Sequence, residues 1–430
     1  MSATAESAIL GTYLERTSAS ADLMKRSAEV MPAGSTRSFG YFDPYPLVFE
    51  RGEGVRLVDV DGHTYIDFTY NGLSLIHGHA YEPVQEALRA ALPKGTAWPG
   101  ASIHQVEFAE LLCSRIPTAE KVRLTNTGTE ATMLGVKLAR QATGRPLVVK
   151  FQGAYHGSYD DLEAGLYGIG ELEGRTLVGT FGDLDSFERA FAAHQGEIAA
   201  VVIEPILFTF QVIPPPPGFL NDLVELARSH GILAILDDCL MFRLAEGGSA
   251  ERYGIAPDIT CLGKWIGGGL PVGAIGSTDE LMRIFDPQHE TALYHGGSFN
   301  GNPLGCAAGK VAVERYRSPD IERMDAQAAR IFAALEHGAA EVGIGLDVTG
   351  DGSVIGLNVL DAAGEPQDHL TRRLQMAAIN HGVYIGQDGE IAMATPFTDD
   401  DVTEAIAGLH AGLADLSKEL QEQASEGDPR

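Results

Sequence analysis

Short apolar runs alternate with amphipathic segments through the middle of the chain. The runs cover residues 147–151, 199–203, 233–236, 259–262 and 272–275. They are rich in β-branched residues and bounded by Gly, Pro or Asp, which is typical of buried parallel strands. Between them, residues 184–194 and 219–229 place their apolar side chains on one side of a helix. This alternation predicts an α/β sheet covered by helices on both faces.

The two ends of the chain follow a different pattern. Residues 55–68 predict a β-hairpin, because Asp61-Gly62 stands between two alternating strands. After Pro319 the pattern predicts a helix over 321–342, strands near 346–348 and 354–359, a helix over 371–381, a strand over 391–394 and a helix over 400–419. Residues 1 to about 20 and 421–430 are polar, and we expect them to be loose. The C-terminal part therefore predicts a second, smaller α+β domain.

Composition and charge narrow the class of protein. The 430 residues are enough for two or three domain-sized units and a large core. The net charge of -28, from 31 basic and 59 acidic residues, argues against a nucleic-acid or anionic-membrane partner, because such partners need a positive patch. The cysteines form no CxxC pair, so we expect reduced thiols in a cytoplasmic protein and no metal site. They are Cys113, Cys239, Cys261 and Cys306.

The sequence predicts no targeting or membrane segment. Its start has no cationic stretch followed by an apolar run, so no secretory signal is expected. No apolar stretch is long enough to span a bilayer. We therefore expect partners that are small molecules in solution.

A lysine stands at the end of a predicted buried strand. In ITCLGKWIGGGLPVGAIGS, residues 259–277, the strand ends at Leu262 and is followed by Gly263, Lys264 and three glycines after Ile266. Burying an ammonium group is unfavourable, so a lysine at this place indicates a chemical use, such as attack of its amine on an aldehyde. The glycines would let the backbone approach a bulky ligand. A surface lysine beside a flexible turn is the alternative interpretation.

A carboxylate follows the neighbouring strand. In LAILDDCLMF, Asp237 and Asp238 come directly after that strand, 27 residues before Lys264. Because adjacent strand ends of an open α/β sheet line one crevice, Asp237 and Lys264 can meet there. Pyridoxal phosphate (PLP) needs this pair: the lysine forms a Schiff base, and the carboxylate keeps the pyridine nitrogen protonated. An aspartate that caps a helix is the alternative interpretation.

Two further motifs fit a phosphate and a flat ring. Residues 124–140, LTNTGTEATMLGVKLAR, run from a strand through Thr127, Gly128 and Thr129 into a helix, whose free N–H groups can bind a phosphate. In GAYHGS, residues 153–158, Tyr155 can stack on a ring. Each motif is weak by itself, since an ordinary capped helix or an aromatic loop has the same pattern.

The four motifs, in this order, resemble those of the class III aminotransferases of PLP fold type I. Within that class the chain is similar to glutamate-1-semialdehyde 2,1-aminomutase and to the β-phenylalanine aminotransferase. The resemblance covers roughly residues 22–418 and includes the segments PYPLVFERGEGVRLVDVDGHTYIDF, NTGTEA, YHG, IEP, IPPPPGFL, LGKWIGGGLPVGA and GSFNGNP. It implies an α/β fold with a large domain, whose sheet is mostly parallel, and a smaller α+β domain formed by both chain ends.

The resemblance also implies domain boundaries. Residues 1–69 would contribute to the small domain and residues 70–318 would form the large PLP-binding domain. Residues 319–418 would complete the small domain, and 419–430 would be a disordered tail.

Roles for individual residues follow from the same resemblance. Lys264 resembles the Schiff-base lysine that also shuttles protons, and Asp237 resembles the partner of the pyridine nitrogen. Ser298 takes the place of a threonine that reaches the phosphate of the neighbouring subunit, which implies a homodimer with active sites at the interface. The other implied cofactor contacts are Gly128 and Thr129 in the phosphate-binding turn, Tyr155 on one face of the ring, Cys239 on its second face, and Glu204 of the IEP motif.

Some residues near these motifs depart from the family pattern. The family usually reads DEV where this chain has DDC at 237–239, and the cysteine packs like the small aliphatic residue that it replaces. Met241 and Phe242 replace a Thr or Ser pair. After the IEP motif comes ILFTFQ, whose Phe208 and Phe210 either make the pocket more apolar or pack into the core.

Two residues are candidates for substrate recognition. Arg37, in GSTRSF, matches an arginine that many relatives use to hold a substrate carboxylate, and an arginine fork suits that geometry. In the β-phenylalanine enzyme a second arginine lies near the C-terminal strand, and Asp388, in GQDGEI, takes its place here. The aminomutase has an acidic residue close by. An exposed Asp-Gly turn is the alternative interpretation of Asp388.

Three functions remain open. The first is an aminotransferase that moves an amino group from an amine or amino acid, including a β-amino acid, to a keto acceptor by a ping-pong mechanism through Lys264. The second is an aminomutase of the glutamate-1-semialdehyde type, favoured by Arg37 and Asp388. The third is a non-catalytic PLP-fold binding protein, which would need neither Lys264 nor Asp237.

Overall fold

The computed structural model describes residues 7–166, 175–208 and 212–426, and the chain divides into two compact units. The larger unit comprises residues 71–76 and 82–321, and the smaller comprises 1–70, 77–81 and 322–430. The predicted fold class is confirmed, because the larger unit carries a mostly parallel sheet and both chain ends form the smaller α+β unit.

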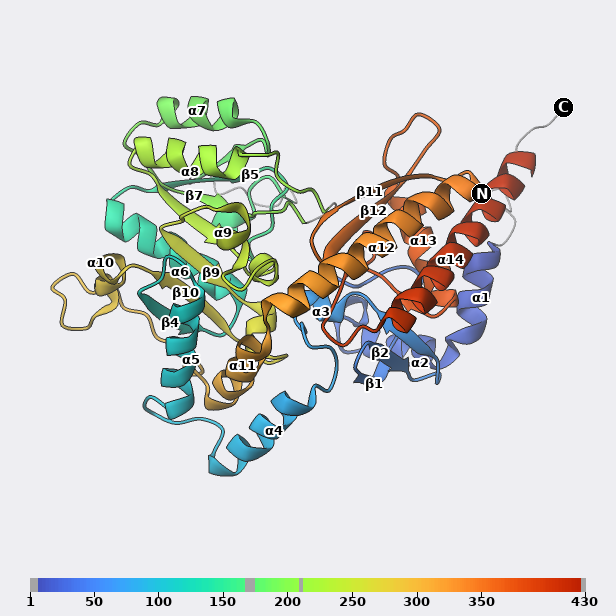
Figure 1. Ribbon diagram of the computed structural model, residues 1–430, viewed down its shortest axis with the longest axis horizontal. Helices are drawn as coiled ribbons and strands as arrows, with labels where there is room; N and C mark the ends of the chain where they lie inside the picture. Colours follow the sequence, from blue (N-terminus) through green and yellow to red (C-terminus); the bar gives the residue numbers. More distant parts are fainter. Residues whose placement is uncertain (1–6, 167–174, 209–211, 427–430) are drawn as a thin grey trace. The chain divides into compact units, whose positions relative to one another are not determined.

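A seven-stranded sheet is the centre of the larger unit (Figure 1). Its strands, in spatial order, are β4 (Lys121–Thr125), β10 (Gly273–Ser277), β9 (Ile259–Leu262), β8 (Leu233–Asp237), β7 (Ile198–Ile203), β5 (Leu147–Phe151) and β6 (Thr176–Gly179). The five strands from β9 to β6 are parallel. The carboxyl ends of parallel neighbours share one edge of the sheet, where ligands of such folds bind.

Strand β10 is antiparallel to both of its neighbours, so the prediction of a parallel strand at 272–275 was wrong. Only ten residues separate the end of β9 at Leu262 from the start of β10 at Gly273. A parallel return needs a crossover of a dozen or more residues, usually with a helix. The short connection therefore turns the chain back beside β9.

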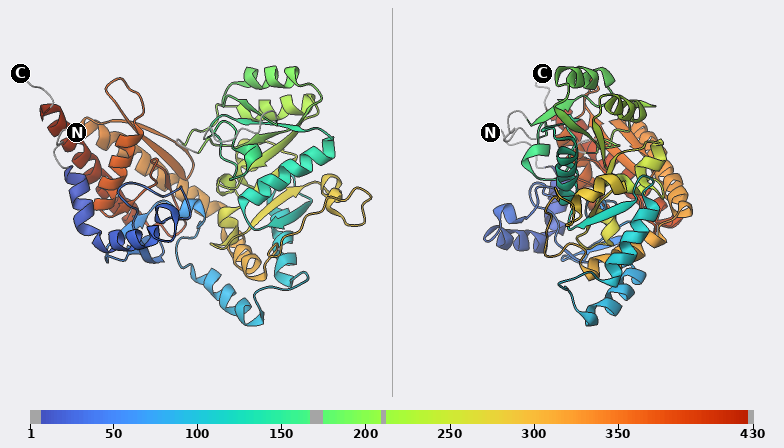
Figure 2. Two further views of the ribbon diagram at one scale, coloured as in Figure 1. Left: turned by 180° about the vertical axis from the view of Figure 1, so that it is seen from behind. Right: turned by 90° about the vertical axis from the view of Figure 1, so that its left-hand side faces the viewer.

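Helices cover both faces of this sheet (Figure 2). Helix α6 (Gly128–Thr143) packs on one face through an apolar cluster that includes Leu134, and α7 (Leu184–Ala193) and α8 (Phe219–Ser229) pack on the other through Phe187 and Leu223. Alternate residues of β5 serve the two faces: Val148 lies with α6, and Phe151 with α7 and α8. The remaining helices of this unit are α4 (Glu82–Ala91), α5 (Ile103–Arg115), α9 (Gly248–Tyr253), α10 (Asp279–Met282) and α11 (Pro303–Arg315).

The smaller unit contains two short sheets. One has the order β1 (Phe49–Glu53), β2 (Arg56–Asp59), β3 (Thr64–Asp67) and β13 (Val383–Tyr384), and the other β11 (Gly345–Asp351), β12 (Val354–Leu360) and β14 (Ile391–Ala392). Strands β2 and β3 form the predicted hairpin across Asp61-Gly62. The helices are α1 (Ala8–Arg16), α2 (Ser18–Ala28), α13 (Asp368–Asn380) and α14 (Asp399–Glu426), while α12 (Ser318–Val342) begins in the larger unit and α3 (Tyr70–Leu73) spans the division.

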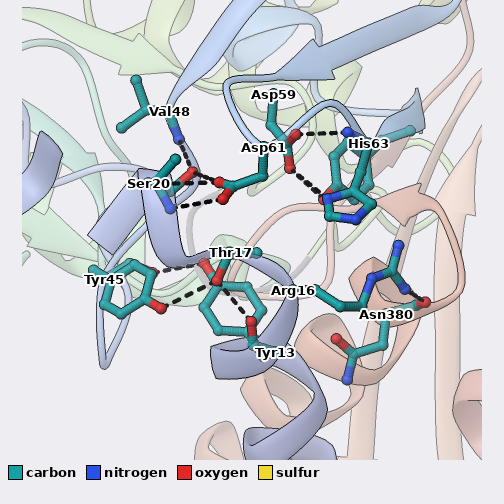
Figure 3. A network of polar contacts seen from close by, with 12 residues as sticks. Tyr13, Arg16, Thr17, Ser20, Tyr45, Val48, Asp59, Asp61, His63 and Asn380 are labelled. Atoms are coloured by element: carbon teal, nitrogen blue, oxygen red, sulfur yellow. Dashed lines mark hydrogen bonds and ion pairs between the residues drawn. The ribbon is translucent and has the colours of Figure 1, made fainter. Parts of the chain in front are cut away.

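Helices cover Ala8–Arg16 and Ser18–Ala28, so the prediction of a loose N-terminal segment was wrong for residues 8–20, while residues 1–6 lie outside the described residues. The Asp61 carboxylate accepts hydrogen bonds from the N–H groups of Ala19 (2.6 Å) and Ser20 (3.0 Å) and thereby caps α2. Figure 3 shows the contacts between Asp61 and Ser20. The Arg16 guanidinium donates to the carbonyl of Asn380, on α13. Both partners are distant in the sequence, and a local pattern does not contain them.

The last helix runs to Glu426, beyond the predicted end at residue 419, so residues 420–426 are helical and not a disordered tail. Residues 413–426 contain no glycine or proline, and Leu413 and Leu416 are fully buried. Among the described residues, no helix is both long and apolar enough to cross a bilayer.

Candidate active site

A cavity of about 110 Å³ opens at the edge of the sheet where the parallel strands end. Lys264 follows β9, Asp237 ends β8, Glu204 follows β7, and Tyr155 lies in the segment after β5. All of its lining residues belong to the larger unit. They are Gly128, Thr129, Tyr155, His156, Gly157, Glu204, Asp237, Cys239, Leu240, Met241 and Lys264.

The Asp237 carboxylate is buried and held from two sides. Nδ1 of His156 lies 2.8 Å from its Oδ2, and the N–H of Cys239 donates to its Oδ1 over 3.2 Å. Burial alone would raise the pKa of Asp237, but the bonds to His156 and Cys239 and the charge of Lys264 outweigh burial and lower it. Asp237 is therefore an ionised carboxylate facing a cavity, suited to hold a positive charge on a bound ring.

His156 is the functional residue that sequence reasoning missed. Its side chain is fully buried, and burial lowers its pKa despite the opposing effect of Asp237. A neutral ring that faces a carboxylate through Nδ1 carries its proton there and donates it, which leaves Nε2 as an acceptor. Nε2 has no hydrogen-bond partner within the described part of the chain. The GAYHGS motif contains His156 directly after Tyr155, and this position was the available signal.

The start of α6 forms the floor of the cavity. Thr127 caps the helix by accepting from the N–H of Glu130 (3.1 Å), and the Glu130 carboxylate in turn accepts from the N–H of Asn126 (2.7 Å). These bonds leave the N–H groups of Gly128 and Thr129 at the first helical turn, where they have no intrahelical partner. Such a turn attracts an anion, because the N–H groups and the helix dipole point the same way.

Glycines let three backbone segments approach one another at this turn. A Cβ atom at Gly128 would lie 2.8 Å from Sγ of Cys239, and one at Gly263 would lie 3.0 Å from Cα of Gly128. A Cβ atom at Gly157, where φ is +97°, would lie 2.7 Å from Cα of Thr129. A side chain at any of these positions would push the strand ends away from the helix. The glycines thus shape the cradle for a phosphate and an adjoining ring.

Lys264 stands directly beside this cradle. It is half-buried, and its φ of +55° lies in the left-handed region that favours glycine. A residue without a special task is rarely kept in that conformation, and such outliers concentrate at functional sites. The conformation turns the chain sharply at the end of β9, and the side chain of Lys264 lines the same cavity as Asp237.

Two more predicted cofactor contacts line the cavity. Burial raises the pKa of the Glu204 carboxyl to about 8, and the charge of Asp237 acts in the same direction. Burial likewise raises the pKa of the Cys239 thiol well above its usual range, so this side chain packs as a small apolar group.

The departures from the family pattern divide into lining and core residues. Met241 lines the cavity. Phe242 is buried and stacks on Trp265, with ring centroids 5.7 Å apart, and it does not line the cavity. Phe208 is also buried outside the lining, whereas Phe210 lies outside the described residues.

Three predicted site residues lie elsewhere. Ser298 is exposed on the larger unit and does not line the cavity of its own chain. Arg37 and Asp388 belong to the smaller unit, where Arg37 is exposed and Asp388 pairs with Arg372 over 3.4 Å. Their contacts with a substrate or a second subunit stay predictions.

The cavity suits a flat ring that carries a phosphate and a basic nitrogen. The first turn of α6, which can bind an anion, and the Asp237 carboxylate face one cavity. The exposed ring of Tyr155 lines the same cavity, and the Lys264 amine there can react with an aldehyde. Among the described residues, no cluster of His, Cys, Asp or Glu could hold a metal ion. The donor set therefore fits pyridoxal phosphate.

Comparison with known proteins agrees with this geometry. The family described as aminotransferase class-III matches residues 41–162 and 182–413. A glutamate-1-semialdehyde 2,1-aminomutase from Desulforudis audaxviator is 36% identical over 414 residues, covering 90% of this chain and 95% of the relative.

Solved structures of similar proteins share the fold. An omega-transaminase from Sphaerobacter thermophilus has a TM-score of 0.89 and 35% identity, covering 94% of this chain and 99% of its own. A transaminase with PLP bound has a TM-score of 0.88 and 32% identity, covering 96% and 99%. The β-phenylalanine aminotransferase from Variovorax paradoxus has a TM-score of 0.86 and 31% identity, covering 94% and 96%.

Proposed function

This chain belongs to the class III aminotransferases and uses pyridoxal 5′-phosphate, and on that premise we propose that it transfers an amino group between a small-molecule donor and a keto acceptor. The observation that carries the proposal is that Lys264 and the buried, ionised Asp237 line one cavity with an anion-binding helix start. A protein that only bound the cofactor would need neither the amine nor the carboxylate.

The proposed placement of the cofactor follows from the lining residues. The N–H groups of Gly128 and Thr129 bind the phosphate, Tyr155 packs on one face of the ring, and Cys239 packs on the other. Asp237 holds a proton at the pyridine nitrogen. When bound, pyridoxal phosphate supplies an aldehyde for the amino group and a ring that accepts electrons. Glu204 completes the wall as a carboxyl that can keep its proton near neutral pH.

Lys264 has two proposed tasks. Its amine holds the cofactor until the donor amine displaces it, and the freed amine then takes the proton from the substrate carbon. The half-buried position beside Gly263 keeps the amine within the cavity in both tasks. Because the donor product leaves before the acceptor binds, the kinetics are ping-pong.

The test is a two-substrate assay on the purified holoenzyme with a panel of donors. We expect a donor, such as a β-amino acid, an α-amino acid or a simple amine, to bleach the visible cofactor band, and pyruvate or 2-oxoglutarate to restore it. Lys264→Ala should lose the visible band and most of the turnover. If no donor bleaches the band, the protein binds the cofactor but does not transfer amino groups.

An aminomutase of the glutamate-1-semialdehyde type is the second candidate, favoured by the name of the relative from Desulforudis audaxviator and by the acidic Asp388. Isotope labelling separates the two. An aminotransferase passes a ¹⁵N label from the donor to an added keto acid, whereas an aminomutase keeps the label in the rearranged product of one substrate.

We also propose a homodimer in which Ser298 reaches the phosphate of the second copy. The support is the exposure of the loop that carries it, since Tyr294 and Phe299 are 87% and 62% exposed, and such large apolar groups are typical of an interface. Light scattering should give twice the chain mass of 45.8 kDa. Ser298→Ala should weaken PLP binding without changing that mass.

A further inference from the structure

Lys150 is an ammonium group in the interior of the larger unit. It lies on β5, all five residues of which are buried, and it has no exposed surface. The alternation of a strand puts it on the face of Val148, toward α6, at the end of β5 that leads to Tyr155. A buried ammonium group is unfavourable unless its donors are all paired.

The three N–H donors of Lys150 are paired with three backbone carbonyls. Nζ donates to Ala154 (2.7 Å), Leu162 (2.8 Å) and Ala164 (2.9 Å). All three acceptors lie in one irregular segment, residues 154–164, which contains no strand and only a short 3₁₀ turn, Asp160–Leu162. An irregular segment lacks the regular hydrogen bonds of a sheet, so its carbonyls need other donors. The ammonium group of Lys150 provides donors for three of them.

This segment carries the cavity wall. Ala154, the first acceptor, immediately precedes Tyr155 and His156, which both line the cavity. The carbonyl of His156 accepts from Oγ1 of Thr132 on α6 (2.6 Å). The segment is therefore fixed by β5 at Ala154 and by α6 at His156, the residue whose Nδ1 contacts Asp237.

We propose that Lys150 is a positioning residue for the cofactor: its ammonium group fixes residues 154–164 so that Tyr155 and His156 are held at the cavity. The proposal rests on the cofactor placement proposed above. The charge also matters, because burial lowers the pKa of Lys150 only to about 8, so the ammonium form with three donors prevails below that pH. Its charge adds to burial in keeping His156 neutral.

The test compares two variants with a matched control. Lys150→Met keeps the length of the side chain but removes all three donors, and Lys150→Gln restores two of them. The control is Arg145→Met: Arg145 precedes the same strand and its Nη1 donates to the carbonyls of Ile198 (3.1 Å) and Gly231 (2.8 Å), away from the cavity. The measurements are the PLP dissociation constant, the thermal midpoint of the cofactor-free protein, and hydrogen exchange along the chain.

We expect Lys150→Met to raise the PLP dissociation constant by about tenfold or more, because hydrogen bonds from a charged donor are lost, and Lys150→Gln to recover part of this. Exchange should rise within residues 154–164 of the cofactor-free protein before it rises elsewhere. Arg145→Met should lower the thermal midpoint and leave the PLP dissociation constant within about twofold of the parent.

Two results would overturn the proposal. One is unchanged exchange in residues 154–164 of both Lys150 variants, and the other is a loss of PLP affinity in Arg145→Met equal to that in Lys150→Met. Failure of the proposed function looks different: the parent protein itself would form no visible band with PLP, or Lys264→Ala would keep it.

Discussion

The cofactor cavity and the two candidate substrate residues are built in different ways. Around the cavity, Asp237 and His156 are buried, and their mutual hydrogen bond is 2.8 Å long. In the smaller unit, Arg37 is exposed, and Asp388 makes a longer, partly exposed ion pair with Arg372. Buried, paired groups fix a single geometry, whereas exposed charges contribute little energy and adapt to what binds. The comparison teaches that the groups lining the cavity are fixed by burial and pairing, whereas the two candidate substrate residues lie at more exposed positions.

The largest expected effect is at Lys264. Lys264→Ala removes the amine that we propose moves the proton, and we expect turnover to fall by about 10²–10⁴-fold. The measurement is steady-state turnover on the donor found with the panel. The control is Lys310→Ala, since Lys310 pairs with Glu107 on the surface (2.9 Å) and lies outside the cavity. An equal loss of turnover in Lys264→Ala and Lys310→Ala would contradict a specific role of the cavity lysine.

A smaller loss is expected at His156. His156→Phe keeps a ring in the buried space but removes the bond to Asp237, and a hydrogen bond to a charged group is worth about 1.5–3 kcal/mol, or roughly 10- to 100-fold. We expect the turnover number to fall by that factor, with the Michaelis constant of the donor less affected. His194→Phe is the control, because His194 pairs with Glu197 at the surface. A larger effect on the Michaelis constant than on turnover would place His156 with the substrate groups.

The substrate residues should affect binding alone. Arg37→Gln should raise the Michaelis constant of a carboxylate donor by about tenfold, since a charged hydrogen bond is lost, and leave PLP affinity unchanged. Asp388→Asn should change the Michaelis constant of the same donor by less than about threefold, as is typical of a partly exposed ion pair. The measurement is the Michaelis constant for a donor with and without its carboxylate. Loss of PLP affinity in either variant would break the proposed division between the units.

The smallest effect is a change in the pH dependence of stability. Burial raises the pKa of Asp238 to about 7. A carboxyl whose pKa is higher in the folded state stabilises the fold fully below its unfolded pKa of about 4, and this contribution is lost as the pH rises through about 7. Asp238→Asn should therefore flatten the fall in unfolding free energy between about pH 5 and pH 8, measured by urea denaturation of the cofactor-free protein.

The control for this experiment is Asp361→Asn. The backbone N–H of Glu365 holds the pKa of Asp361 below its usual range, so this carboxyl stays ionised throughout the window. Its replacement should shift the unfolding free energy by a constant amount. A slope that stays the same in Asp238→Asn would show that Asp238 does not titrate in this range.

The sequence predicted the elements whose own residues carry a clear pattern. Strands β5 and β9 and helix α8 have the predicted bounds, because each is an apolar run or an amphipathic segment with turn residues at its ends. The N-terminal helices were not predictable, since Asp61 and Asn380 stabilise them from distant parts of the chain. The direction of β10 could have been inferred from the length of its connection.

The candidate site shows the same limit. Lys264, Asp237 and Gly128 were identified because strand ends and helix starts meet at one edge of a sheet. Lys150 was not, since VVKF reads as an apolar strand whose lysine could equally reach solvent. Its three acceptors come from an irregular segment, and no sequence pattern specifies where the carbonyls of such a segment point.

The strand order has a consequence for the growing polypeptide on the ribosome. Strand β4, residues 121–125, pairs with β10 in the sheet. This pairing cannot form until residue 277 has been synthesised. The larger unit is complete in sequence at residue 321, whereas the smaller must wait for β13 to pair with β3. Nascent chains arrested shortly after residue 321 would therefore already contain the whole cavity, with the smaller unit still unfinished.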